Sequence, residues 1–175
     1  DHAGLGLIVV TLPPQESPLL DRVQGKPDVE TPLRQLKRQR LKDQGGDVYI
    51  SPRAKASLRA NDDFDLTSKV QEFLNSDRKV LLLLGDSGAG KSTFNRNLEI
   101  DLWKVYKKIV GRIPLFVHLP TIDKPEHNLI DKQLRKLNFT DEQIIELNSY
   151  REFILIFDGY DESPQTRNLY VSNHF

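Results

Sequence analysis

Cysteine and methionine are both absent from the 175 residues of the sequence. Without cysteine, the chain can form neither disulfide bonds nor thiolate metal sites. That absence is compatible with the reducing cytoplasm, and we expect a cytoplasmic protein. Because the sequence starts at Asp1 without an initiator methionine, we interpret it as an internal or processed piece of a longer protein.

Net charge and long apolar runs are missing as well. The 25 basic residues balance 25 acidic ones, so no overall electric field attracts nucleic acid or an anionic membrane. The longest apolar runs, at residues 80–84 and 153–157, are far shorter than the roughly 20 residues that span a bilayer. We therefore expect no nucleic acid and no membrane as partner, and function must reside in a local site.

The N-terminal part of the sequence is rich in proline and glycine. These residues recur between positions 13 and 32 and deny regular structure a long run. Residues 5–12 are apolar, but no basic region precedes them, so we do not expect a signal peptide there. We interpret residues 1–46 as a linker that ends in a short basic helix at 33–44. We expect the basic side chains of this helix to lie on a solvated face and not to contact phosphates.

The remainder of the sequence alternates strand and helix patterns. Residues 48–52 are β-prone, 64–74 have helical spacing, and the apolar run at 80–84 predicts a strand that is buried on both faces. A second helix follows to about residue 110, and then come a strand at 113–119, helices at 129–137 and 141–150, and an apolar strand at 153–157. This order predicts an α/β fold with a parallel sheet flanked by helices.

A glycine-rich motif separates the first apolar strand from its helix. Residues 85–92, GDSGAGKS, satisfy G-x-x-x-x-G-K-[ST] at every fixed position, which fewer than about 1% of chains of this length would do by chance. Glycines let successive backbone N–H groups surround phosphate oxygens, and the helix dipole adds positive potential. Lys91 would reach the β and γ phosphates, and the Ser92 hydroxyl would bind Mg²⁺. The residues expected to bind the nucleotide are Gly85, Asp86, Ser87, Gly88, Ala89, Gly90, Lys91, Ser92 and Thr93.

Acidic residues follow the last apolar strand, in FILIFDGYDES at 153–163. We expect Asp158 to hold the metal together with Ser92, and Gly159 to leave room beside the nucleotide. Glu162 is our candidate general base, with Asp161 as its helper. The alternative is that these acids only solvate a loop. His118 and His127 have no paired nucleophile or metal cluster in the sequence, and we assign them structural or surface roles.

Together, GDSGAGKST and FILIFDGYDES resemble the NACHT group of signal-transducing P-loop NTPases, over about residues 47–175. The second motif carries the resemblance: an apolar strand, an aspartate, a tiny residue and then an acidic pair. The resemblance implies a three-layer P-loop NTPase core, with ADP bound in a resting state and ATP in an oligomer-competent state. It also implies that self-association uses regions of the parent protein that follow this sequence.

By this resemblance, the sequence ends after the Walker B strand at 153–157, and the strand that should lie between it and the strand at 80–84 is missing. We therefore expect unpaired edges on two buried strands and a poorly stable fragment. We expect nucleoside triphosphatase activity from the full-length parent and not from this fragment. Two alternatives stay open, a non-catalytic interaction module with a vestigial nucleotide site and another P-loop enzyme, a small kinase or a GTPase.

Overall fold

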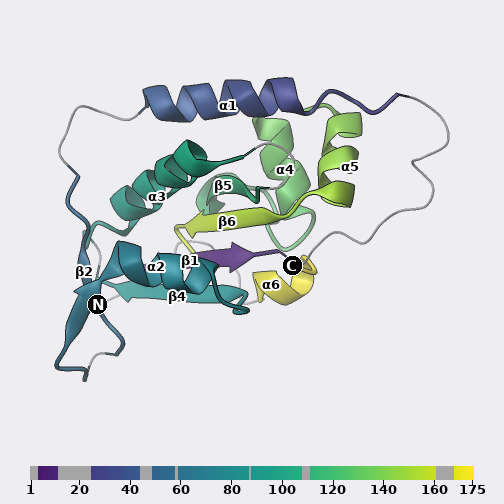
Figure 1. Cartoon of the computed structure of the whole chain (residues 1–175). Helices are drawn as coiled ribbons and strands as arrows, with labels where there is room; N and C mark the ends of the chain where they lie inside the picture. Colours follow the sequence, from purple (N-terminus) through teal and green to yellow (C-terminus); the bar gives the residue numbers. More distant parts are fainter. Residues whose placement is uncertain are drawn as a thin grey trace.

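A computed structural model describes residues 4–11, 25–43, 49–57, 59–86, 88–107, 111–160 and 168–175 of the chain. The fold is α/β, with one four-stranded sheet and a separate two-stranded hairpin. Helices lie on both sides of the four-stranded sheet (Figure 1). Within these residues, no helix is long and apolar enough to cross a membrane.

The four-stranded sheet has the order β4 (Val80–Gly85), β1 (Gly4–Val10), β6 (Phe153–Asp158) and β5 (Ile113–His118). Strands β5 and β6 are parallel, whereas β1 is antiparallel to both of its neighbours. Strands β4, β5 and β6 therefore point the same way, and their carboxyl ends meet at one edge of the sheet. Parallel strands of α/β proteins commonly present ligand sites at this edge.

Strand β1 corrects two sequence predictions. We expected residues 4–10 to be linker and the position between the strands at 80–84 and 153–157 to be empty, but β1 fills that position. Its register places Leu7 opposite both Leu82 and Phe157. The physical reason is that the backbone groups of two neighbouring strands need partners, and an apolar run of Leu, Ile and Val supplies them. The sheet is consequently mixed and not parallel throughout.

Two apolar clusters form the core, one on each face of the sheet. Alternation along β6 divides its residues between them: Ile154 and Ile156 face one cluster, and Phe153, Leu155 and Phe157 face the other. The first cluster includes α2 (Leu66–Leu74) and α3 (Lys91–Val105). The second includes α4 (Leu129–Lys136), α5 (Asp141–Tyr150) and the short α6 (Leu169–Ser172).

The remaining elements are peripheral. Helix α1 (Glu30–Lys42) packs against α3 through the buried Leu33 and Leu36, and β2 (Arg53–Lys55) pairs with β3 (Asp63–Asp65). A 3₁₀ turn at Leu119–Thr121 follows β5. The β-prone residues 49–52 are not a strand in the structure, since β2 begins at Arg53.

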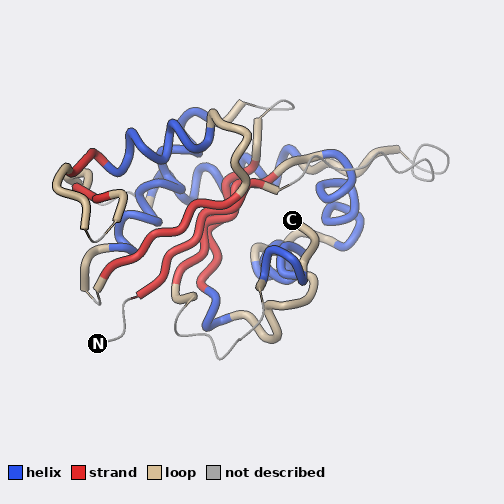
Figure 2. Tube along the Cα trace, turned by 90° about the horizontal axis from the view of Figure 1, so that it is seen from below, coloured by secondary structure: helices blue, strands red, loops and turns tan. Residues whose placement is uncertain are grey.

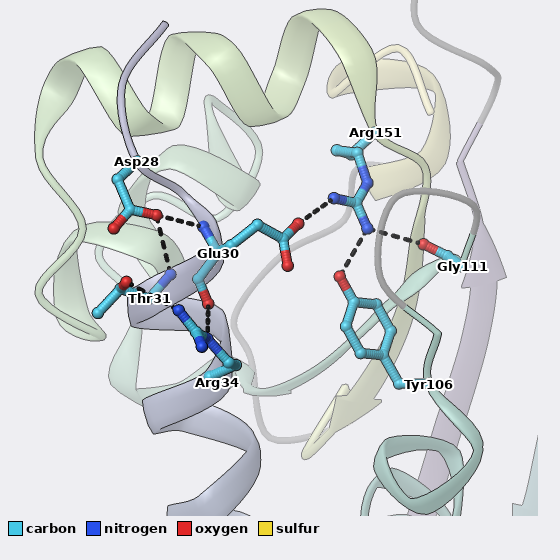
Figure 3. Close-up of polar contacts among 7 residues, drawn as sticks. All are labelled: Asp28, Glu30, Thr31, Arg34, Tyr106, Gly111 and Arg151. Carbon is cyan, nitrogen blue, oxygen red and sulfur yellow. Dashed lines mark hydrogen bonds and ion pairs between the residues drawn. The ribbon is translucent and has the colours of Figure 1, made fainter.

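A polar network fixes the start of α1 (Figure 3). The side chain of Asp28 accepts hydrogen bonds from the N–H groups of Glu30 and Thr31, 3.0 Å each, which explains why the helix begins before the predicted residue 33. Arg151, directly after α5, donates to Glu30 Oε1 at 3.2 Å and to the Tyr106 hydroxyl at 2.6 Å. These contacts attach α1 to the ends of α3 and α5.

Candidate functional site

The loop between β4 and α3 combines two glycines in a left-handed conformation with the N-terminus of a helix. Gly88 and Gly90 adopt φ angles of +80° and +82°, a left-handed conformation that side-chain-bearing residues rarely adopt. Gly90 is also the N-cap residue of α3, a helix of 15 residues. The first N–H groups of a helix have no intrahelical acceptor, so the loop directs free donors and the positive helix end to one place. Ser87 lies outside the described residues.

Lys91 folds back over this loop. Its Nζ donates to the carbonyl oxygens of Gly85, at 2.7 Å, and Asp86, at 2.6 Å. The ammonium group therefore lies inside the curve of the loop, and its partners among the described residues are these two carbonyl oxygens. Ser92 and Thr93 follow it with exposed side chains in the first turn of α3.

Asp158 ends β6 as a buried carboxylate with 6% of its surface exposed. Its Oδ1 accepts a hydrogen bond from Asn95 Nδ2 at 3.3 Å, and its Oδ2 lies 3.4 Å from His118 Nδ1. Asn95 follows Lys91 by four residues, which places both on the same face of α3. The structure thus brings the lysine-bearing helix and the predicted metal ligand together through Asn95.

Sequence reasoning missed Asn95, and it assigned His118 only a structural or surface role. His118 ends β5 directly opposite Asp158 in the parallel register, so the contact follows from a pairing that the sequence does not state. Asn95 could have been found from its helical spacing to Lys91 once the strand of Asp158 was placed beside α3. Neither residue belongs to the motif at 85–92 or to that at 153–163.

Gly159 is required for a different reason from the one we expected. Its φ angle is +70°, and a Cβ atom there would lie 2.8 Å from Cδ and 2.9 Å from Cγ of Pro120. The turn after β5 therefore occupies the space that we expected to remain open beside a nucleotide. Glycine lets this turn approach the end of β6, and the approach places His118 beside Asp158.

The oxygen ligands present at this site fit a magnesium ion that is bound together with phosphates. Asn95 Oδ1 is buried and has no hydrogen-bond partner in the described structure, so the site retains an unsatisfied acceptor for a hydroxyl or water. Among the described residues, no three His, Asp or Glu side chains cluster as a metal cage. Magnesium typically takes one or two protein carboxylates and completes its shell with water and substrate phosphates. One carboxylate, Asp158, and one hydroxyl, Ser92, match that requirement.

The predicted catalytic acids Asp161 and Glu162 lie outside the described residues. Their roles remain predictions from the sequence. The left-handed glycines Gly88 and Gly90, Lys91 and Asp158, in contrast, are described and lie near the carboxyl ends of parallel strands. Comparison of the chain with family models, with curated proteins and with solved structures gives no match.

Proposed function

We propose that the chain binds ATP with Mg²⁺ at residues 85–93 and that it belongs to a NACHT-like P-loop switch that hydrolyses ATP slowly. One observation carries the proposal: the αL glycines directly precede α3, Lys91 folds back over their loop at the N-terminus of this helix, and the same helix contacts the buried Asp158. Phosphate binding needs the first three features. Metal binding needs the fourth.

In the proposed complex, the phosphates replace the carbonyl partners of Lys91. The Lys91 ammonium then neutralises β- and γ-phosphate charge, and free N–H groups of the loop and α3 donate to the phosphate oxygens. The Ser92 hydroxyl and Asp158 hold Mg²⁺, which supplies further neutralisation of the phosphate charge. Asn95 keeps the Asp158 carboxylate oriented through its Nδ2 hydrogen bond.

For hydrolysis, we assign the activation of the attacking water to Glu162, with Asp161 as helper. In the parent protein, binding and slow turnover would switch an assembly on and off. A carboxylate that activates water affects the chemical step more than ground-state binding. Glu162→Gln should therefore leave ATP affinity within about twofold of the wild-type value and abolish ATP hydrolysis.

The first test is magnesium-dependent binding of fluorescent ATP and GTP analogues. Lys91→Ala should lower ATP affinity by at least about 100-fold, because it removes a charge-assisted contact to two phosphates. Lys104→Ala is the matched control, since Lys104 lies at the other end of α3 and, among the described residues, pairs only with Asp101 on the surface. Unchanged ATP affinity in Lys91→Ala would refute the nucleotide site, and a preference for GTP would refute the base assignment.

A further inference from the structure

The two outer edges of the four-stranded sheet differ in their protection. At the β5 edge, Pro114 has no N–H to offer, and both backbone groups of Phe116 are occupied. The Phe116 N–H donates to Glu99 Oε1 at 3.3 Å, and its carbonyl oxygen accepts from Gln133 Nε2 at 2.8 Å. Side chains from α3 and α4 therefore close this edge against another strand.

The β4 edge is open. The Val10 N–H donates to the Lys79 carbonyl oxygen at 2.9 Å, so by alternation residues 81, 83 and 85 also direct their backbone groups to β1. Residues 80, 82 and 84 direct theirs away from the sheet. In the described part of the chain, no hydrogen bond connects these three to another element. In Figure 2, which views the molecule from the β4 side, no described helix crosses in front of the strands.

The same three residues expose large apolar side chains. Val80, Leu82 and Leu84 are 41%, 51% and 67% exposed, although they belong to a strand of the main sheet. An edge strand with free backbone groups and apolar side chains is a template for pairing with another strand. Natural proteins usually place a lysine, a proline or a bulge at such positions. Residues 80–85 contain no lysine and no proline, and their register with β1 is continuous, without a bulge.

We propose that β4 pairs antiparallel with β4 of a second copy of this chain, with Leu82 opposite Leu82 on a two-fold axis. This register joins residues whose backbone groups both point outward, and it forms about six hydrogen bonds between the strands. Val80 of each copy lies opposite Leu84 of the other. The two sheets become one continuous sheet of eight strands.

Charge selects this register. With Leu82 on the axis, Arg78 of each copy lies opposite Asp86 of the other, and both residues are exposed. Opposite charges directly across an antiparallel pair are favourable, and the two-fold axis repeats the pair. A strand that is basic before its apolar centre and acidic after it is complementary to its own antiparallel copy.

The test is sedimentation velocity of the whole chain at micromolar to submillimolar concentrations, without nucleotide. We expect a monomer–dimer equilibrium that Leu82→Lys shifts to monomer, because the ammonium groups of both copies would meet at the axis. Ile145→Lys is the matched control, since Ile145 is an equally exposed apolar residue on α5, and it should leave the dimer unchanged. The proposal is overturned if the wild-type chain stays monomeric or forms open-ended aggregates. It is also overturned if the Leu82→Lys variant dimerises as well as the wild type.

A charge exchange at the surface keeps the proposal testable if Leu82→Lys fails to fold, as judged by its thermal melt. Arg78→Asp and Asp86→Arg should each raise the dimer dissociation constant about tenfold, because each places two like-charge pairs across the strands. The double variant should restore the dimer to within about threefold of wild type. Absence of restoration rejects the register, and with it the proposed pairing. The proposal does not depend on nucleotide binding.

Discussion

Asn95 supports the proposed metal site through the carboxylate of Asp158. It is fully buried and donates to Asp158 Oδ1 and to the Phe157 carbonyl oxygen, both at 3.3 Å. A carboxylate that is oriented in this way can present its remaining lone pairs to a cation. Residues that orient metal ligands typically contribute 10-fold to 100-fold to metal affinity.

Asn95→Leu should therefore weaken magnesium-dependent ATP binding by at least about tenfold, while binding measured in EDTA changes little. Leucine keeps the volume of the side chain but removes its donor. Titration of a fluorescent ATP analogue with and without Mg²⁺ measures both quantities. Asn97→Ala serves as control, because in the described part of the chain Asn97 donates only to the carbonyl oxygen of Thr93 in the same helix. Equal losses with and without Mg²⁺ would show that Asn95 supports the fold and not the metal.

Glu99 is a second buried polar residue of α3, and it connects this helix to α1. Its carboxylate accepts hydrogen bonds from Arg40 Nε at 3.1 Å and from the Phe116 N–H at 3.3 Å. Burial raises the pKa of Glu99 above its ordinary value, and the opposing effects of Arg40 and the Phe116 N–H do not cancel that increase. The folded protein consequently holds this proton more tightly than the unfolded chain does.

This raised pKa predicts the direction of a pH effect. Below the unfolded-state pKa of about 4.5, both states are protonated and Glu99 contributes no pH dependence. As pH rises above that value, the unfolded chain releases the proton first, so the free energy of unfolding falls until the folded-state pKa is passed. Glu99→Gln should remove this part of the decline. Urea unfolding at several pH values from 4 to 8 measures it, and an identical slope in Glu99→Gln would contradict the prediction.

Among the elements, β1 has the largest effect on the architecture. It is hydrogen-bonded on both sides, to β4 and to β6, and it separates the strand before the phosphate loop from the strand of Asp158. Without it, both of those strands would have an open edge inside the sheet. We predicted a poorly stable chain because we assumed that these two edges are open. In the structure, the N-terminal part of the chain supplies β1 as the partner of both strands.

Ile8→Ala measures the contribution of β1. Ile8 is completely buried between the sheet and the cluster that includes α2 and α3, so the substitution should lower the free energy of unfolding by about 2–4 kcal/mol. Ile50→Ala removes the same atoms from a side chain that is 81% exposed, and it should change stability by less than about 0.5 kcal/mol. Equal effects in urea unfolding would mean that β1 does not pack in this position.

Local patterns predicted most of the remaining elements. The strands at 80–84, 113–119 and 153–157 and the helices at 129–137 and 141–150 lie within a residue or so of β4, β5, β6, α4 and α5. Each of these has periodicity or a long apolar run of its own. Strand β1 also has an apolar run, but a short apolar run between glycine and proline is ambiguous, and its two partners lie about 75 and 147 residues away in register.

The same distinction between local and distant information applies to the candidate site. The motif at 85–92 is contiguous, so the sequence alone predicts Lys91 and Ser92. Asp158, Asn95 and His118 come from three different elements, and only the fold brings them together. The position of His118 also depends on Gly159, because any larger residue would displace Pro120 and the turn after β5.

At the scale of the whole molecule, a nucleotide at the carboxyl ends of β4, β5 and β6 would connect elements from both faces of the sheet. A ligand that binds only the folded chain stabilises it by about 2.7 kcal/mol at a free concentration of 100 times its Kd. For a chain of 175 residues, this corresponds to a rise in Tm of roughly 5–10 °C. Trp103 is the only tryptophan and is completely buried, so its fluorescence reports global unfolding.

Mg-ATP should therefore raise the Tm followed by Trp103, whereas ATP with EDTA should produce a smaller rise and Mg²⁺ alone almost none, since the proposed metal site needs phosphate oxygens to complete its shell. Lys91→Ala should melt near the wild-type Tm without ligand and lose the response to Mg-ATP. Lys104→Ala should retain it. A response that survives in Lys91→Ala would mean that the nucleotide stabilises the fold from somewhere other than the loop between β4 and α3.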